Sequence, residues 1–388
     1  MLASLSALSA AAVDMYLPAF PTVASSLGIT AGQVQQTLTV FLIGLGVGQG
    51  LYGPLLDRFG RRIPLLIGLS LFVLGSLAAA LTTSFEGLLV ARFLQAIGAA
   101  AGAVASRAVV TDTCDTHSSA RIYSMLMQMM MIAPITAPML GGLILLYGEW
   151  HLIFWVLAFF GSACWLFTAR LLPETLSVER RVPLSTHSIV RNYALQLRNP
   201  SFFFYTLASG CIFGSLFLYV TTSPFVFISM FGLTPTQFSY IFASNAIGMI
   251  VIGQINLRLL KYYGAARVLF IGISCFIGIG VVLLSLVQLE RIALWSYSLL
   301  LGLSVAMLGM ILGNLTALTM AHTQQHAGIA SALMGLMQFL LAAMIGFLVS
   351  LTAPTLSTVP LALIVFGVLS LSLCGVARRF ARQATPDP

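Results

Sequence analysis

One acidic residue lies inside an apolar stretch near the start of the chain. Asp14 stands about two-thirds of the way along residues 1–23 and is followed by Tyr16, Pro18 and Pro21. A charged aspartate at the centre of a bilayer costs about 2.5–3.5 kcal/mol or more, so it should face a cavity, pair with a cation or carry a proton. Because burial and a nearby cation act on a carboxyl group in opposite directions, its proton affinity can be tuned. Asp14 is therefore a candidate proton carrier; the alternative is a permanent ion pair that only fastens this helix.

An arginine in the apolar stretch 87–110 is the expected partner of Asp14. Arg92 comes six residues after Glu86, at a depth compatible with that of Asp14. Since arginine stays charged in proteins, it could hold the carboxylate when the site is empty and release it when a proton arrives. The alternative is that Arg92 extends its charged group to the nearby membrane surface.

A second group of charges follows the second apolar stretch. Its members are spaced as GxxxDRxGRR, and an aspartate and an arginine from the end of the fourth stretch are expected to join them. We expect these charges to lock one side of the molecule closed and to separate when the molecule rearranges; the alternative is a solvated basic loop. The group comprises Gly53, Asp57, Arg58, Gly60, Arg61, Arg62, Arg107 and Asp112.

The stretch 121–147 combines methionines with prolines and glycines. Methionine side chains adapt to varied ligands, although each could equally face lipid. The run Pro134, Pro138, Gly141 and Gly142 should bend and thin this helix and let it pack tightly against its neighbour.

Nothing in the sequence indicates an enzyme or a metal site. The five cysteines are scattered without a CxxC pair, which is typical of small core residues and not of a metal site or a disulfide framework. The five histidines lack ligand spacing, and no Ser/His/Asp or paired-carboxylate arrangement is present. We expect no cofactor, with a proton gradient as the energy source.

The composition is that of a protein surrounded by lipid. Of 388 residues, 59% are hydrophobic and 7% are charged, whereas soluble domains carry about 25% charged residues. A membrane helix needs roughly 20 apolar residues. Twelve stretches qualify, the first as a full span and not as a cleavable signal: 1–23, 33–55, 63–83, 87–110, 121–147, 150–172, 201–228, 236–260, 267–288, 293–318, 327–351 and 357–377.

The positive charges predict the orientation. Fifteen of the 18 Lys and Arg residues lie in even-to-odd connections or in the C-terminal segment, whereas only Arg291 lies in a connection of the opposite kind. By the positive-inside rule, both termini face the cytoplasm. The net charge of +8 thus reports topology, and a nucleic-acid partner is not expected.

The chain also repeats itself. At an offset of 204 residues, positions 28–72 and 232–276 share 14 identities in 45, including Gly28/Gly232 and Gly60/Gly264; about one in ten would match by chance in so biased a composition. Two similar halves are typical of a rocking transporter with its substrate site between them. We expect a bundle of six helices at 1–172, a cytoplasmic linker at 173–200 and a second bundle at 201–388.

These motifs together resemble a known family. The chain is similar to the major facilitator superfamily, and specifically to drug:proton antiporters of the bicyclomycin/chloramphenicol-resistance (Bcr/CflA) type, over residues 10–377. The resemblance rests on the segments 14–18, 53–62, 92–95, 137–142, 149–155, 223–225 and 327–331. The second of these is general to the superfamily, the fourth points to antiporters, and the first points to this subgroup.

The resemblance implies a role for each motif. Asp14 would carry the proton and Arg92 would couple it, while Asp57, Arg61 and Asp112 would form the cytoplasmic gate. The helix with Pro138 and Gly141 would seal the outer half. Ala137 and Ala96 replace glycines that the family usually has, and no second acid precedes Asp14, which argues against a two-carboxylate mechanism. The residues expected to line the substrate cavity are Asp14, Tyr16, Gln95, Gln128, Met131, Phe217 and Asn245.

We therefore expect an all-α membrane protein of the major facilitator fold. It would act as a monomer in a bacterial inner membrane and export small drug-like or metabolite molecules in exchange for protons. Two alternatives remain: proton-coupled uptake of a nutrient such as a sugar or nucleoside, and a membrane sensor or scaffold without substrate flux. The proline–glycine motif favours export over uptake, and the charges inside the membrane argue against a sensor.

Overall fold

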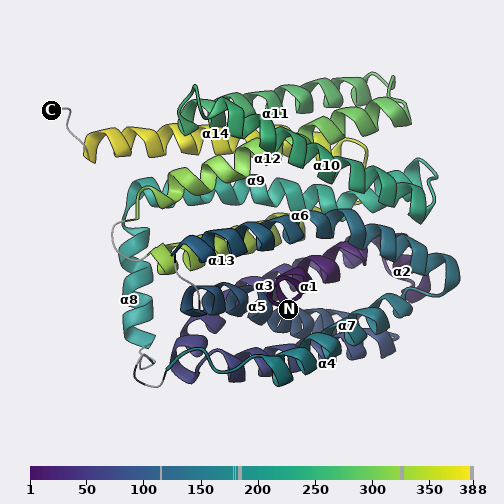
Figure 1. Cartoon of the computed structure of the whole chain (residues 1–388). Coiled ribbons are helices and arrows are strands. Elements are labelled where there is room, and N and C mark those ends of the chain that lie inside the picture. Colours follow the sequence, from purple (N-terminus) through teal and green to yellow (C-terminus); the bar gives the residue numbers. More distant parts are fainter. Residues whose placement is uncertain (114–115, 178, 180, 182–185, 324–326, 385–388) are drawn as a thin grey trace. The chain divides into compact units, whose positions relative to one another are not determined.

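The computed structural model is built of helices connected by short turns (Figure 1). It describes the backbone outside residues 114–115, 178, 180, 182–185, 324–326 and 385–388; the side chains at 111, 113, 116–131, 186–190, 192, 327–328 and 382–384 are also left out of the description. Eleven helical segments in the described part are long and apolar enough to cross a membrane. With helix α6, they confirm the predicted architecture.

The described helices divide into two units by their contacts. Unit 1 is Met1–Ser185 with Gly232–Ala243, and unit 2 is Thr186–Phe231 with Ser244–Pro388. The elements of the first part of the chain are α1 (Leu2–Asp14), η1 (Leu17–Ala19), α2 (Phe20–Leu27), α3 (Ala31–Phe59), α4 (Arg62–Leu81), α5 (Phe85–Thr113), α6 (Thr116–Tyr147) and α7 (His151–Leu171). Those of the second part are α8 (Thr186–Leu197), α9 (Pro200–Pro224), η3 (Phe225–Met230), α10 (Pro235–Leu259), α11 (Ala265–Gln288), α12 (Leu294–Met320), α13 (Ala327–Ser350) and α14 (Thr358–Ala384).

In unit 1, helix α5 is central. It packs against α3, α4 and α1, while α4 also packs against α7 and α1 packs against α6. Small residues allow the close approaches: at Gly98 of α5, an added methyl group would overlap the backbone of Phe72 in α4. Close backbone contact through small residues is the usual way in which membrane helices associate.

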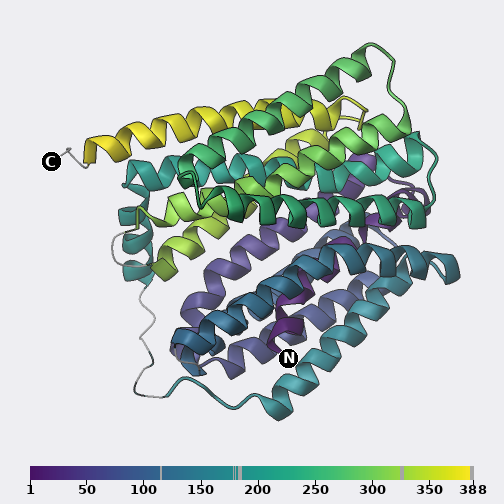
Figure 2. The ribbon, with the colours of Figure 1, turned by 45° about the horizontal axis from the view of Figure 1, so that its top comes forward.

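In unit 2, helix α9 packs against α12, α13 and α14, and α11 packs against α12 and α14 (Figure 2). An amide pair joins two of its helices: Asn314 donates from Nδ2 to Oδ1 of Asn256 at 2.8 Å. Such a pair satisfies polar groups that lipid could not.

The first span is not one continuous helix, although the sequence suggested a single stretch. Helix α1 ends at Asp14, the short 3₁₀-helix η1 follows, and α2 begins at Phe20. Pro18 and Pro21 stand at the starts of η1 and α2, where their missing N–H groups cost little. The break therefore leaves Asp14 at the end of a helix, next to a 3₁₀ turn.

The internal repeat appears in the local structure. Gly28 and Gly232 both adopt positive φ, 63° and 74°. Two residues later, Thr30 and Gln33 exchange reciprocal capping bonds at 2.9 and 3.2 Å, and Thr234 and Gln237 do the same at 3.0 and 3.2 Å. Both copies thus begin a long helix with the same capping box.

Candidate functional site

Asp14 closes helix α1 in a buried position. Its residue is 7% exposed, and the described part of the chain offers its carboxylate no ion pair within 4 Å. The next residues pack into an aromatic cluster, in which the Tyr16 ring lies 4.9 Å from Phe20 and 5.3 Å from Phe154. A carboxyl group in such surroundings is costly to keep charged.

Arg92 is fully buried, but it does not form the expected ion pair with Asp14. Instead, its Nη1 donates to the Ala12 carbonyl at 3.0 Å and to Gln95 Oε1 at 2.6 Å. The interaction with Ala12 is nevertheless only two residues from Asp14. The guanidinium therefore holds the last turn of the helix that ends at Asp14, although no described bond joins it to the carboxylate.

Aromatic rings surround the Arg92 guanidinium. Its central carbon lies 4.2 Å from the ring centroid of Phe41, 4.9 Å from Tyr16 and 5.7 Å from Phe154. Stacking on aromatic faces stabilises a desolvated arginine by about 2 kcal/mol or more. The Nε and Nη2 atoms, however, have no hydrogen-bond partner among the described residues. The site thus holds a buried cation in which two nitrogen atoms, Nε and Nη2, have no described acceptor.

Gln95 positions this arginine. Its Nε2 donates to the Ser76 hydroxyl at 2.8 Å, and that hydroxyl donates to the Phe72 carbonyl at 2.7 Å. The chain of bonds therefore runs from α5 to α4. Gln95 and Tyr16 were both expected to line a substrate cavity; their side chains are fully buried in unit 1, and the cavity role stays a prediction.

The charged group at the α3–α4 turn is assembled as expected at three positions. Arg61 binds Asp57 through Nη1 at 2.6 Å and Asp112 through Nε at 2.7 Å. A second contact from Nη2 to Asp112, at 3.4 Å, makes that pair bidentate. Burial opposes the charge of Arg61, but its bonds to Asp112 and Asp57 outweigh this and raise its pKa. This arginine therefore keeps its charge and fastens α5 to the α3–α4 turn.

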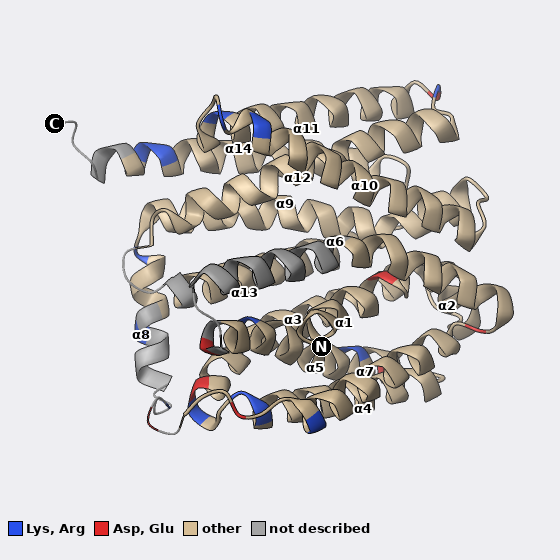
Figure 3. Ribbon diagram, in the orientation of Figure 1, with Lys and Arg blue, Asp and Glu red and all other residues tan. Residues whose placement is uncertain are grey.

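The other residues predicted for this group lie nearby in different roles. Arg62 donates to the Ala169 carbonyl in α7 at 2.5 Å, and Gly60 takes the positive φ of 89° that ends α3. Arg58 and Arg107 are exposed, and a side chain at Gly53 would meet no neighbour within 4 Å. Figure 3 shows the blue and red residues at the turn between α3 and α4.

Two residues that sequence reasoning assigned to the linker also belong to this group. Glu174 accepts the backbone N–H groups of Arg61 at 2.8 Å, Arg62 at 3.3 Å and Leu176 at 3.0 Å. Thr175 donates to Asp112 at 3.3 Å. Partial burial opposes ionisation of Glu174, but these N–H donors outweigh it and lower its pKa. An acid just after the sixth span, on the side of the basic turn, was the signal available in the sequence.

The glycines of α6 let it lie against the break in the first span. At Gly141, an added Cβ would overlap the Met15 backbone, directly after Asp14. At Gly142 it would lie 2.7 Å from Ser239 Oγ, and this hydroxyl is 2.8 Å from the Pro138 carbonyl. The segment Gly232–Ala243 is thereby held within unit 1. The side chains of Gln128 and Met131, which we expected to line the cavity, lie outside the described residues.

Unit 2 contributes its own polar and aromatic groups. Asn245, predicted as a cavity residue, is 5% exposed and donates to the Tyr219 hydroxyl at 2.8 Å. Phe217 lies 4.9 Å from Phe213 and 6.4 Å from Phe339, ring centroid to ring centroid. Gln338 donates to Ser209 at 2.6 Å, a pair of residues that sequence reasoning did not identify.

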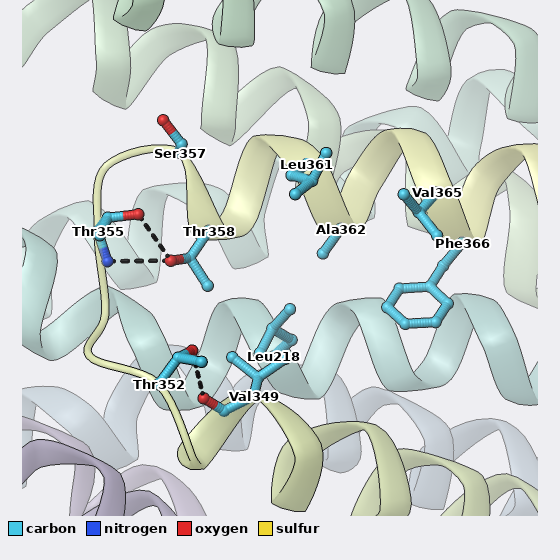
Figure 4. Close-up of a pocket in the computed structure, with 10 residues that line it drawn as sticks. All are labelled: Leu218, Val349, Thr352, Thr355, Ser357, Thr358, Leu361, Ala362, Val365 and Phe366. Carbon is cyan, nitrogen blue, oxygen red and sulfur yellow. Dashed lines mark hydrogen bonds between the residues drawn. The ribbon is translucent and has the colours of Figure 1, made fainter.

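A cavity of about 320 Å³ lies within unit 2, where α9 meets the connection between α13 and α14 (Figure 4). Its walls are apolar, with Leu218 and Phe366 among them. Polar groups at its rim form hydrogen bonds with one another: the Thr358 hydroxyl accepts the Thr355 N–H at 2.9 Å and lies 3.0 Å from the Thr355 hydroxyl. We assign no role to this cavity.

Comparisons with known proteins agree with the architecture. The model of the Major Facilitator Superfamily matches residues 2–347. A Bacillus subtilis protein described as an uncharacterized MFS-type transporter, YdgK, is 37% identical, with 91% of this chain and 88% of the relative covered. Among solved structures, a D-xylose–proton symporter superposes with a TM-score of 0.76 over 95% of both chains at 14% identity, which shows the fold alone.

Two further relatives carry descriptions that name drugs. A bicyclomycin resistance protein homolog of Haemophilus influenzae is 32% identical, covering 87% of this chain and 85% of its own length. A chloramphenicol resistance protein of Pseudomonas aeruginosa is 35% identical, covering 81% of this chain and 73% of its own. The chain therefore belongs to the major facilitator superfamily of membrane transporters and, within it, to the bicyclomycin/chloramphenicol-resistance type.

Proposed function

We propose that this transporter exports small drug-like or metabolite molecules from the cytoplasm in exchange for protons, by alternating access. The relatives described as bicyclomycin and chloramphenicol resistance proteins support the drug-export part of the proposal. The buried charges of unit 1 support the proton-coupled part. The protein would work as a monomer in a bacterial inner membrane.

The observation that carries the proposal is the unfilled hydrogen-bonding capacity of Arg92, which binds the helix that ends at Asp14. The guanidinium is fully buried, donates to the carbonyl of Ala12, and has two nitrogen atoms, Nε and Nη2, without a described acceptor. An unpaired buried cation is expensive, so an anionic oxygen that reaches it is strongly attracted. The Asp14 carboxylate, at the helix break, belongs to the acid nearest in sequence to Ala12, two residues further on.

The proposed cycle has two states of the carboxyl group. With the protein open to the outside, a proton binds to the Asp14 carboxylate, which becomes neutral and needs no cation. After the protein opens to the cytoplasm, substrate enters, the proton leaves to the cytoplasm, and the charged carboxylate turns to the free N–H groups of Arg92. Each elementary charge moved through the membrane potential supplies about 2.3 kcal/mol per 100 mV.

Two other groups would control access. The pairing of Arg61 with Asp57 and Asp112 would close the cytoplasmic side and break when that side opens. The close contact between Gly141 and Met15 would transmit movement of the first span to α6.

The decisive experiment replaces Asp14 in the full-length protein reconstituted in liposomes. We expect Asp14→Asn to abolish proton movement driven by a chloramphenicol or bicyclomycin gradient, while exchange of labelled for unlabelled drug without a proton gradient continues. Asp14→Glu should retain part of the coupling. Glu86→Gln, which removes an exposed acid of the same unit, is the matched control and should behave like the parent.

Three outcomes would contradict the proposal. Equal proton flux in Asp14→Asn and the parent would exclude Asp14 as the carrier. Accumulation of substrate in the cytoplasmic compartment would indicate uptake instead of export. Absence of flux for the tested drugs, together with flux for a sugar or nucleoside, would move the protein to the nutrient-uptake alternative.

A further inference from the structure

One end of unit 2 carries five exposed cations. Arg258 and Lys261 lie at the end of α10 and in the turn that follows, Arg267 lies in the first turn of α11, and Arg378 and Arg379 lie near the end of α14. None of the five has an ion pair within the described residues. We refer to these five residues as the basic patch, and Figure 3 shows the corresponding blue segments on α11 and α14.

The packing of α11 against α14 places these cations at one level. A Cβ added at Gly280 would lie 3.1 Å from Leu363, and one added at Gly367 would lie 2.6 Å from Ile277. The two helices are therefore antiparallel, and partners along them have residue numbers that sum to a nearly constant value. By this register, Arg267 lies level with Arg378, so that α14 extends the charge of the α10–α11 turn.

Among its described residues, unit 2 places no acid at the basic patch. Its only acidic residue within the described part is Glu290, in the connection between α11 and α12 at the other end of α11. Asp387, the other acid of this half, lies outside the described residues. The separation of charge is therefore almost complete along the length of the unit.

The internal repeat shows that the α10–α11 turn lacks the acidic partners found at the α3–α4 turn. In unit 1, Asp57 pairs with Arg61, and the Glu174 carboxylate accepts the N–H groups of Arg61 and Arg62. At the offset of 204 residues, Lys261 replaces Asp57, while Ala265 and Ala266 replace the two arginines. The basic turn of the first copy thus has two acidic partners, Asp57 and Glu174. In the second copy, Asp57 is replaced by a lysine, and no described acid takes the place of Glu174.

The surroundings indicate which kind of anion fits. Exposed apolar side chains such as Leu257 and Ile271 flank the patch on the same helices, 56% and 44% exposed. Tyr262 is 80% exposed beside them, and the Arg267 guanidinium lies 5.1 Å from the Tyr263 ring. Tyrosine is typical of the level of lipid head groups. Cations at that level, continuous with an apolar surface, fit a phosphate that is attached to acyl chains.

We propose that the basic patch binds the phosphate head group of an anionic phospholipid, with the acyl chains lying along α10 and α11. Basic clusters beside membrane spans attract anionic lipids by about 1 kcal/mol per Lys or Arg. Each cation removed should therefore weaken binding about fivefold. The site lies outside the proton-coupling residues and requires no transport for its detection.

The test measures lipid binding to the purified full-length protein in detergent by native mass spectrometry. Phosphatidylglycerol and phosphatidylcholine with identical oleoyl chains are compared, so that only the head group differs. We expect the parent to bind phosphatidylglycerol at least about a hundredfold more tightly. The triple variant Arg258→Gln/Lys261→Gln/Arg267→Gln should lose affinity for phosphatidylglycerol on the order of a hundredfold and keep its affinity for phosphatidylcholine, which also shows that it is folded.

Three controls make the result specific. Arg170→Gln/Arg191→Gln/Arg198→Gln removes the same charge elsewhere and should bind phosphatidylglycerol like the parent. Lys261→Asp, which copies the first half of the repeat, should weaken binding more than Lys261→Gln. Arg258→Lys/Arg267→Lys keeps the charge and should retain affinity within about fivefold. Inorganic phosphate at millimolar concentration should not displace the lipid.

The opposite results would overturn the proposal. Equal affinity of the parent for the two lipids would exclude a head-group site. An equal loss in the control triple variant would show an effect of net charge alone. Displacement of the lipid by inorganic phosphate would indicate a site for the free anion.

Discussion

Arg61 and Arg92 show how two buried arginines of one unit are stabilised differently. Arg61 has two carboxylate partners, Asp57 and Asp112, at 2.6 and 2.7 Å. Arg92 has one carbonyl, one amide oxygen and three aromatic rings, and two of its nitrogen atoms have no described partner. A paired buried charge stabilises the fold once it is present, whereas an incompletely paired one is retained at a cost in stability. Arg61 is thus fully paired in this state, whereas Arg92 has two nitrogen atoms without a described acceptor, as the proposed coupling role requires.

Replacement of each arginine by leucine should therefore have opposite consequences. Arg61→Leu leaves two carboxylates without their cation and should lower the free energy of unfolding by about 3–5 kcal/mol. Arg92→Leu removes an unpaired buried charge, so stability should stay within about 1 kcal/mol of the parent, while drug-driven proton flux is lost. Thermal unfolding in detergent and flux in liposomes measure the two effects. A large loss of stability in Arg92→Leu would show that the arginine is structural.

Glu174 links stability to pH through the start of the linker. Its pKa is lowered from 4.5 because the N–H groups of Arg61, Leu176 and Arg62 outweigh partial burial. A carboxyl group with a lowered pKa in the folded state stabilises above its unfolded pKa, and this contribution is lost as the pH falls through the folded value. Glu174→Gln should therefore lower stability by about 1 kcal/mol at pH 7.

The pH dependence identifies the cause of that loss. The difference between Glu174→Gln and the parent should shrink as the pH falls below 4.5, since both side chains are then neutral. Thermal unfolding measured from pH 7 to pH 3.5 checks this. Glu86→Gln, which removes an exposed acid of the same unit, serves as the control. A difference that stays constant with pH would show that the carboxylate charge is not involved.

At the scale of elements, the break in the first span and the glycines of α6 form one device. Pro18 and Pro21 interrupt the helix after Asp14, and Gly141 brings α6 onto the backbone of Met15. The break ends the helix at Asp14, and α6 packs against that end; both are needed to place the Asp14 carboxylate at a packed helix end. A continuous first helix would turn Asp14 into one more residue of a regular surface, with its backbone groups already satisfied.

A methyl group at Gly141 should separate these elements. Gly141→Ala would force Cβ into the Met15 carbonyl, so we expect a loss of stability of about 1–3 kcal/mol and a strong reduction in transport. Gly278→Ala is the matched control, because a Cβ at Gly278 meets nothing within 4 Å and alanine favours helix. Thermal unfolding and drug flux of the two variants provide the comparison. Equal behaviour of the variants would exclude the proposed contact.

At the scale of the whole molecule, the distribution of charged residues predicts how the protein is oriented in the membrane. The connections α3–α4 and α10–α11 and the last turns of α14 are basic, whereas the described acids Glu149 and Glu290 lie in connections of the opposite kind. By the positive-inside rule, we expect the basic connections to lie in the cytoplasm. Since α11 separates Tyr262 from Trp295, these two residues should lie on opposite sides of the membrane.

Cysteine labelling tests this orientation with two equally accessible sites. Tyr262 and Trp295 are both 80% exposed. In a variant whose native cysteines are replaced by serine, Trp295→Cys should react with an impermeant maleimide in intact cells. Tyr262→Cys should react only after the membrane is permeabilised. The reverse pattern would invert the proposed topology.

The sequence alone determined the class of protein, the spans and the charged turn. Apolar length and charge bias act locally, so they can be read without a structure. Asp57 and Arg61 are four residues apart across the turn that Gly60 makes, so the sequence already placed them in one charged group. The capping boxes at Thr30 and Thr234 were likewise encoded within four residues.

Only the tertiary structure decided the surroundings of Arg92 and the role of Glu174. Phe41 and Phe154 reach Arg92 from α3 and α7, and the Glu174 carboxylate meets Arg61 across more than a hundred residues of chain. The sequence suggested that Asp14 pairs with Arg92, because opposite charges in lipid attract. In the structure, Arg92 instead donates to Ala12 and Gln95 and lies among three aromatic rings. Long-range packing selects among partners that the sequence leaves equally possible, and no spacing rule records that selection.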